Sequence, residues 1–236
     1  MQARLFSWLG RECVEVVAEA SSALAADGAV IELFQKCDNE LRGWGLSLDN
    51  VVRVRVWGRD RDARTLATAA RSKILTGKRK AASSSFISRQ WFDSDGSAGL
   101  ELLAMKPTHS GADRQPIDFE PARNYVCYLD YDGLLFFSGF TSEAPSLEEQ
   151  TVEVLATIGK ALARARTDWG KVRKLSALLQ RGQDLETVRR VLGKSRQARY
   201  PGDRVYLRRR LCRREIPVGD RSDGTERVAG NKNFLR

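Results

Sequence analysis

The chain has 236 residues, of which 42% are hydrophobic, and its formal net charge is +10 at pH 7. This apolar content is enough for one large core or two small ones. No apolar run approaches the roughly 18 residues that a membrane span needs, and the first residues lack a signal-peptide core, so we expect a cytoplasmic protein with no membrane partner.

The positive charge is concentrated near the C-terminus. Residues 204–236 contain ten Lys or Arg against four Asp or Glu, so this segment carries +6 and the rest of the chain only +4. A basic tail attracts polyanions, but this one has few aromatic residues on which bases could stack. RNA binding, or an endoribonuclease-like activity, is therefore the least favoured of the functions considered below.

The four cysteines and the single histidine, His109, show no metal-ligand spacing. A zinc site or a His-centred triad is therefore not expected, and the sequence predicts neither a metal nor another cofactor.

The first part of the chain predicts strands and helices with one face buried. In residues 51–57, Val52, Val54 and Val56 lie on one face of a strand and Arg53 and Arg55 on the other. Apolar residues spaced three to four apart predict an amphipathic helix over residues 25–44. The remaining predicted elements are strands over 5–10, 13–20, 82–91 and 100–105 and a helix over 63–75.

The second part begins with a linker by composition. Residues 107–122 should form it, because the stretch from 107 to 116 is rich in turn formers and offers almost nothing to bury. Asp132-Gly133 between two apolar runs is a strong hairpin signal. Ser146 and Glu149 fit a capping box for a helix that should end near residue 165. A strand over 172–179 and a helix over 185–192 should follow.

These elements repeat. Residues 46–57 and 169–179 each hold a strand that is followed by a polar break and a helix, at an offset of roughly 120 residues. We therefore expect an α+β fold of two α/β sandwich units in tandem, residues 1–106 and 123–204, with helices on one face of each sheet.

The order and spacing of several short motifs resemble the Rid/YjgF family of reactive-intermediate deaminases. These motifs are Leu46-Ser-Leu-Asp-Asn-Val-Val before a strand, Ser138-Gly139 at the end of the hairpin, and Leu100-Glu-Leu-Leu-Ala104 as the last strand. The resemblance implies chorismate-mutase-like units, a homo-oligomeric, trimeric assembly with ligand clefts between its parts, and hydrolysis of imines and enamines derived from amino acids. In that family an Arg holds the substrate carboxylate and a Glu lies near the attacking water, with no metal or cofactor.

The resemblance also supplies candidate site residues. Glu101 keeps the first acid of the family's closing strand, whereas residues 81–86, where the anchoring Arg is expected, read Ala-Ala-Ser-Ser-Ser-Phe. Arg199 and Arg204 lie just before the expected closing strand of the second copy, so they are the candidate anchors there. Ser138 and Gly139 could present backbone N–H groups to a carboxylate. Each also has a plain structural reading as exposed surface or a strand-end turn.

The second copy does not finish as the first does. Residues 205–224 lack sheet periodicity, and Pro217 would interrupt a central strand. Read one base later, the degenerate code permits Leu-Glu-Ile-Glu-Val-Thr-Ala, with its Glu-Ile-Glu over positions 219–221. We therefore hypothesise a frameshift near Arg204 or Val205, so that the second unit lacks its last strand and residues 205–236 are an Arg-rich, disordered or out-of-frame tail.

Two further functions compete with RNA binding. The first is a metal-independent deaminase or hydrolase that acts on small imine, enamine or related carboxylate metabolites at inter-domain clefts. The second is a noncatalytic member that binds a metabolite or serves as an oligomeric scaffold, which the missing Arg of the first copy favours.

Overall fold

The computed structural model describes residues 1–20, 25–180, 182–195 and 205–208, the last four as backbone only. The chain divides into two compact units: within the described part, unit 1 is residues 1–139 and unit 2 starts at Phe140. In the described part of the chain, no helix is both long enough and apolar enough to cross a membrane.

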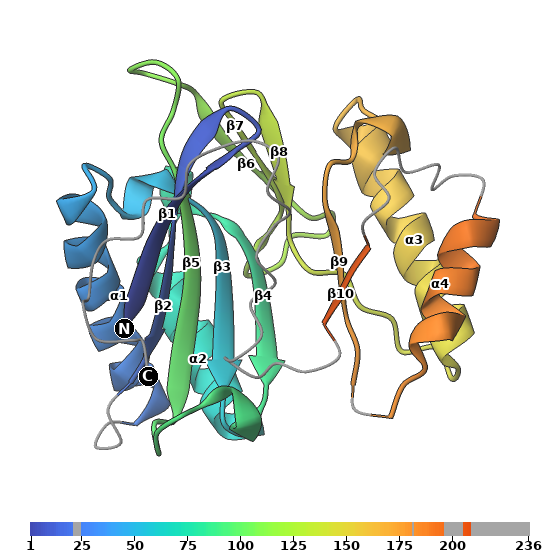
Figure 1. The fold of residues 1–236 in the computed structure, drawn as a ribbon, viewed down its shortest axis with the longest axis horizontal. Helices are drawn as coiled ribbons and strands as arrows, with labels where there is room; N and C mark the ends of the chain where they lie inside the picture. The colour runs from blue at the N-terminus through green and yellow to red at the C-terminus, as the bar shows by residue number, and fades with distance from the viewer. Residues whose placement is uncertain (21–24, 181, 196–204, 209–236) are drawn as a thin grey trace, which may run out of the picture. The chain divides into compact units, whose positions relative to one another are not determined.

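Unit 1 is built on a five-stranded sheet. Its strands are β1 (Gln2–Trp8), β2 (Arg11–Glu19), β3 (Val51–Gly58), β4 (Ala82–Ile87) and β5 (Ala98–Met105). They lie in the order β1-β2-β5-β3-β4 (Figure 1). β5 is the central strand and pairs antiparallel with both β2 and β3, whereas β3 and β4 run parallel. Every residue of β5 is buried, so both faces of this strand are covered.

Two helices cover one face of this sheet and fill the main core. They are α1 (Ala26–Gly43) and α2 (Arg61–Ile74). Alternation along β3 sends Val54 and Val56 into this core, where they meet Leu33 and Phe34 of α1. Burying each such side chain contributes roughly 1.5–3 kcal/mol. The predicted arrangement, with helices on one sheet face, is confirmed for this unit (Figure 1).

A smaller sheet packs against the other face of the five strands. It consists of β6 (Arg114–Asp118), β7 (Val126–Tyr131) and β8 (Leu134–Phe137), in that order. Leu129 and Phe136 form a second core with Met105 of β5. In the turn between β7 and β8, Asp132 and Gly133 have positive φ angles of 51° and 76°. Positive φ at both positions is the requirement of a type I′ turn, which confirms the hairpin predicted from Asp-Gly.

The segment expected to be a linker over residues 107–122 is part of unit 1. It contains β6, and Arg114 at the start of this strand is buried. The Arg114 guanidinium donates hydrogen bonds to the backbone carbonyls of Val51, Lys78 (2.7 Å) and Lys80 (3.0 Å). Burial lowers the pKa of this guanidinium to about 10. Composition suggested a linker because the apolar residues are few, but the anchor of this segment is a charged side chain.

Unit 2 contains two helices and two short strands. They are α3 (Leu147–Arg164), the 3₁₀ turn η4 (Trp169–Lys171), β9 (Leu175–Leu178), α4 (Leu185–Lys194) and β10 (Val205–Arg208). The predicted capping box at the start of α3 is confirmed: Ser146 Oγ accepts from the Glu149 N–H, and the Glu149 carboxylate accepts from the Ser146 N–H. β9 and β10 pair in parallel. Order thus extends at least four residues into the segment from 205 that we expected to be disordered or out of frame.

The tandem repeat is visible in the order of the elements. In unit 1, α1 is followed by the 3₁₀ turn η1 (Leu48–Asn50), β3, α2 and β4; in unit 2, α3 is followed by η4, β9, α4 and β10. Both first helices have 18 residues, and both strand pairs are parallel. The described residues contain no counterpart of β5 after β10. The predicted fold class, two α+β units of which the second lacks its last strand, is confirmed.

The boundary between the units differs from the predicted one. We expected the second unit to start at residue 123, but the β7–β8 hairpin that begins the second copy groups with unit 1, and the division falls after Gly139. In the first copy, β5 joins the opening hairpin to the strand that follows the helix. Since the second copy has no such strand among the described residues, its hairpin is not joined to β9 in one sheet.

The Arg114 anchor can be tested by substitution. Arg114→Met removes the donors that satisfy three buried or partly buried carbonyls, so we expect the free energy of unfolding of unit 1 to fall by about 2–3 kcal/mol. Urea unfolding followed by tryptophan fluorescence measures this change. Gln115→Met is the matched control because Gln115 is the next residue of β6 and is exposed. Equal stability of the two variants would show that residues 107–122 are a linker after all.

Candidate active site at Arg55 and Glu101

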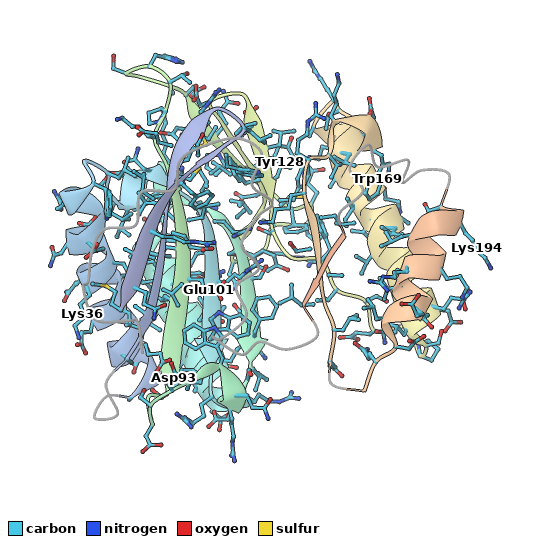
Figure 2. The ribbon with its side chains drawn as sticks, in the orientation of Figure 1. Lys36, Asp93, Glu101, Tyr128, Trp169 and Lys194 are labelled. Carbon is cyan, nitrogen blue, oxygen red and sulfur yellow. The ribbon has the colours of Figure 1, made fainter. Side chains whose placement is uncertain are left out.

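Arg55 and Glu101 form a buried ion pair on the sheet of unit 1. They face each other in register across β3 and β5, with 2.9 Å between Arg55 Nη1 and Glu101 Oε2. Their side chains are only 8% and 10% exposed. Figure 2 shows Glu101 on the sheet of this unit. Removing two charges from water is costly, so a pair at this depth is stable only because each charge compensates the other.

Strand geometry explains why these charges are inside. Val54 and Val56 point to the helices, so Arg53, Arg55 and Trp57 project from the other face of β3. A guanidinium has five N–H donors in a planar fork. Within the described part of the chain, Arg55 uses one nitrogen on Glu101. The rest of the fork is thus suited to a planar oxyanion such as a carboxylate.

Aromatic side chains surround this pair. The Trp91 indole N–H donates to the other oxygen of Glu101 at 3.4 Å, and its ring stacks on Trp57 with centroids 5.5 Å apart. Phe86 stacks on Trp57, with 4.5 Å between their ring centroids. Gly99 leaves room for Trp91, because a Cβ there would lie 1.9 Å from the Trp91 ring. Trp91 therefore lies against the sheet beside Glu101 and lowers the local dielectric around its carboxylate.

A buried indole N–H adds a donor with no acceptor. Trp57 is fully buried, and its Nε1 has no hydrogen-bond partner among the described residues. Unpartnered buried donors are rare and mark places where a water or a ligand can accept a bond. The sheet face that carries Arg55 of β3 and Glu101 of β5 thus combines a cation, an acid and a donor without a described partner.

The predicted Ser138-Gly139 site lies at the end of β8. The Ser138 N–H donates to Cys127 O and the Gly139 N–H to Ser83 O, both at 3.0 Å. Ser138 Oγ also accepts from the Ser83 N–H at 2.9 Å. Both backbone donors thus have protein acceptors in this structure, and the pair ties the small sheet to β4. A ligand carboxylate would have to displace these bonds.

The other two predicted anchors, Arg199 and Arg204, lie outside the described residues. Glu101 is therefore the one predicted catalytic residue whose surroundings the structure describes. The sequence analysis missed Arg55 as its partner. The signal was present in the alternation of Val and Arg along β3, but identifying the pair requires the register between β3 and β5.

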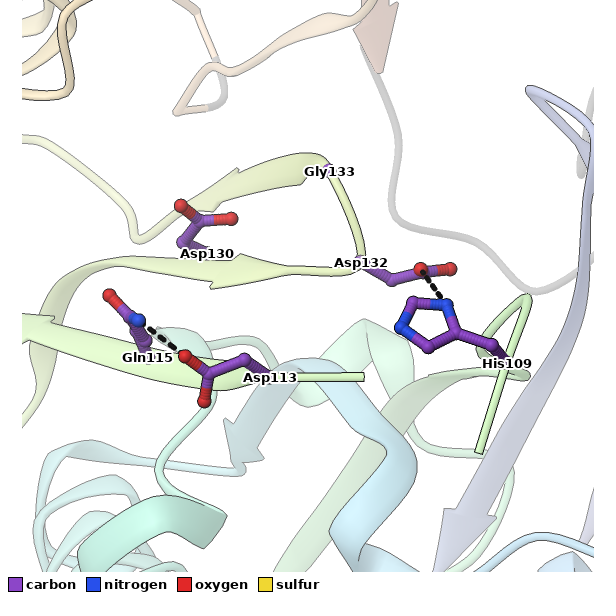
Figure 3. A pocket seen from close by; sticks show the side chains of 6 residues that line it. All are labelled: His109, Asp113, Gln115, Asp130, Asp132 and Gly133. Atoms are coloured by element: carbon purple, nitrogen blue, oxygen red, sulfur yellow. Dashed lines mark hydrogen bonds and ion pairs between the residues drawn. The ribbon is translucent and has the colours of Figure 1, made fainter. Parts of the chain in front are cut away.

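A separate hollow of about 250 Å³ lies beside the β7–β8 turn (Figure 3). Its polar walls include Asp113, Asp130, Asp132 and His109. Asp132 is paired with Arg11 at 2.8 Å, whereas burial and the nearby Asp113 raise the pKa of Asp130. Three carboxylates repel an anionic ligand. The described residues include no cluster of His, Cys, Asp and Glu that could hold a metal ion.

The fold is shared with known proteins, although the sequence is not closely related to theirs. No family profile and no curated protein sequence matches the chain. A crystallised chorismatase matches with a TM-score of 0.58 and 16% identity, over 84% of this chain and 69% of its own. A YjgF-family protein from Neisseria meningitidis matches with a TM-score of 0.37 and 13% identity, over 46% of this chain and 98% of its own. A member of the YjgF/YER057c/UK114 family from Mycobacterium tuberculosis matches with a TM-score of 0.36 and 17% identity, over 40% of this chain and 79% of its own.

These identities are low, so the similarity concerns the fold alone. The chorismatase match covers so much of the chain that it includes parts of both units. The resemblance to the chorismate-mutase-like fold, predicted from the motifs of the sequence, is therefore confirmed at the level of the fold.

The energetic role of the ion pair can be measured with a double-mutant cycle. Arg55→Met or Glu101→Leu alone leaves one buried charge without its partner, so each should lower the free energy of unfolding by about 3–5 kcal/mol. The double variant should lose much less than the sum, because no unpaired charge remains. Chemical unfolding of the four proteins gives the coupling energy.

The exposed pair Lys106–Glu12 is the matched control. Its N–O distance is also 2.9 Å, but its side chains are 59% and 56% exposed. Its coupling should be below about 1 kcal/mol. A coupling for Arg55 and Glu101 as small as this would mean that the pair is in contact with water.

Proposed function

We propose that unit 1 binds a small carboxylate at Arg55 and that the chain is a metal-independent hydrolase of imines, enamines or related carboxylates, as Rid-type deaminases are. The observation that supports this proposal is the buried Arg55–Glu101 pair with Trp91 beside it. The anchoring Arg that the sequence lacks over residues 81–86 is replaced by one on the neighbouring strand, opposite the acid.

The chemistry requires little from the protein. An imine carbon is already electrophilic, so the enzyme has to hold the substrate carboxylate and direct water. The free side of the Arg55 fork binds the carboxylate, and Glu101 accepts a proton from the attacking water. Addition of water to the C=N bond gives an amino alcohol, which loses ammonia when the C=O bond forms. A low dielectric beside Trp91 strengthens each of these charge interactions.

The chorismatase match adds one substrate to those that should be tested. Since that structure matches most of this chain, chorismate, itself a small carboxylate, belongs in the same panel as 2-imino acids. Arg55 would bind its carboxylate in the same way.

A noncatalytic role is the second candidate. Glu101 is already paired with Arg55 and accepts a hydrogen bond from Trp91, so its oxygens are partly occupied before a water arrives. In that case unit 1 would bind a carboxylate metabolite or serve as a scaffold without turning it over. Binding without turnover would identify this role.

Assembly and location follow from the first proposal. Because Rid-type clefts form between parts of an assembly, we propose a trimeric homo-oligomer in the cytoplasm. Nucleic acid is not part of this proposal, since the basic tail that would attract it lies almost entirely outside the described residues.

Conservative variants separate binding from catalysis. Arg55→Lys keeps the charge but loses the planar fork, so the KM for a 2-imino acid should rise about 10- to 100-fold. Glu101→Gln keeps the shape but loses the base, so kcat should fall about 100-fold with little change in KM. Release of ammonia from the freshly generated imine measures both.

Arg53→Lys serves as the control, because Arg53 lies on the same strand and face, two residues from Arg55. Ligand binding with no ammonia release by the unmodified chain would favour the noncatalytic role. Unchanged kinetics in both site variants would remove Arg55 and Glu101 from the mechanism.

A further inference from the structure

Helix α2 and the residues that follow it carry a strong excess of positive charge. Residues 61–80 contain seven Lys or Arg against one Asp, whereas residues 1–139 contain 18 Lys or Arg and 18 Asp or Glu. Two of the seven cations, Arg79 and Lys80, are paired with aspartates. The other five make no ion pair within the described part of the chain: Arg61, Arg64, Arg71, Lys73 and Lys78.

Three of these cations share one side of α2 with two hydroxyl groups. Each member of this stripe lies three or four residues from another, so all five project to the same side: Arg61, Arg64, Thr68, Arg71 and Ser72. The stripe faces the edge strand β4, because Thr68 Oγ1 lies 2.9 Å from Ser85 Oγ. The N-cap Asp60 accepts from the Ala63 N–H instead of forming an ion pair with Arg64. The side of α2 that faces β4 therefore carries positive charge without a bound acid among the described residues.

Arg71 is the buried member of this stripe, and its charge lacks compensation. It is 3% exposed, and burial lowers its pKa to about 10. One nitrogen, Nη2, reaches Ser72 Oγ at 3.1 Å and Asn124 O at 3.4 Å. The buried Arg114, by contrast, uses two nitrogens on carbonyls at 2.7 and 3.0 Å. Arg71 thus has donors to spare, and a bound anion would compensate its buried charge.

Two further buried polar atoms beside the stripe have no partner. Ser83 is 3% exposed, and neither its Oγ nor Arg64 Nε has a hydrogen-bond partner among the described residues. Ser83 projects to the same side of β4 as Ser85. Because α2 connects the parallel strands β3 and β4, it runs back along β4, and Ser83 lies toward the Arg71 end. Unpartnered buried polar atoms are rare and mark places where a ligand or a water can bind.

We propose that this seam between α2 and β4 is a binding site for a phosphate group, with Arg71 as its anchor and Arg64 and Ser83 as further donors. Guanidinium and hydroxyl groups are good donors to phosphate oxygens. These donors come from a helix and from a strand, so they suit a tetrahedral oxyanion better than a planar carboxylate. Inorganic phosphate and the phosphate of a small metabolite present the same oxygens.

The seam does not depend on the function proposed for Arg55. The neighbour of Arg55 on β4 is Ser84, whereas Ser83 and Ser85 project from the opposite face of the sheet. A ligand at Arg55 and a phosphate at the seam would thus lie on opposite faces of the sheet, and each site can be tested without the other.

Calorimetry on the full chain tests the seam with inorganic phosphate, titrated at constant ionic strength so that general screening stays the same. Ser83→Ala removes a hydroxyl without a partner, so it should leave the melting temperature unchanged but weaken phosphate binding about tenfold. Arg71→Lys keeps the charge but loses the planar fork, so it should weaken binding by at least about tenfold. Ser84→Ala is the matched control, because it changes the next residue of β4 on the opposite face.

A nucleoside 5′-monophosphate and a single-stranded RNA identify the source of the phosphate. Tighter binding of the monophosphate than of inorganic phosphate, with the same losses in both variants, would assign the seam to a phosphorylated metabolite. Equal or weaker binding of the monophosphate would assign it to phosphate itself. No binding of either, or equal binding by the unmodified chain and both variants, would overturn the proposal. Binding of RNA alone would also overturn it, because the seam would then be part of a surface for a polyanion.

Discussion

The central strand β5 holds unit 1 together. It pairs with β2 on one side and β3 on the other, so it joins the opening hairpin to the strand between the two helices. Its side chains reach both cores: Leu100 and Leu102 face the helices, and Leu103 and Met105 face the small sheet. Nothing else in the described sheet connects β2 with β3. Strand β5 is the last strand of the first copy in sequence but the central strand of its sheet. The sheet is therefore complete only when the C-terminal end of this copy has paired.

The second copy shows a different arrangement, because its described residues include no central strand. Its hairpin, β7–β8, packs through Leu129 and Phe136 onto the sheet of the first copy and is grouped with unit 1. Its helices and remaining strands form a separate unit with a thinner core. Because each opening hairpin has an apolar face, it must bury that face against some partner, and the nearest folded sheet provides one. One copy of the repeat is thereby divided between two units.

Local patterns were enough to predict most elements, and long-range pairing accounts for the misses. The helices, the Asp132-Gly133 turn and the capping box at Ser146 depend on residues a few positions apart, so the sequence displays them directly. The hydrogen-bond partners of Arg114 lie 34 to 63 residues away in sequence. The partner of Arg55, Glu101, lies 46 residues away. In each case a charged residue is buried by contacts that have no local pattern. A buried arginine in a polar stretch therefore looks like surface until its carbonyl or carboxylate partner is placed beside it.

The ion pair of unit 1 also limits what that unit can do alone. A glutamate that is bonded to Arg55 and Trp91 is well positioned, but both of its carboxylate oxygens already accept a hydrogen bond. The same guanidinium improves the binding of a carboxylate substrate, so binding and proton transfer place opposite demands on this one pair. Substrate binding can resolve the conflict if the incoming carboxylate takes over part of the Arg55 fork, since the Glu101 oxygen that is bonded to Arg55 is then available to the attacking water. In a site of this kind the carboxylate would become accessible to water only when the substrate is bound.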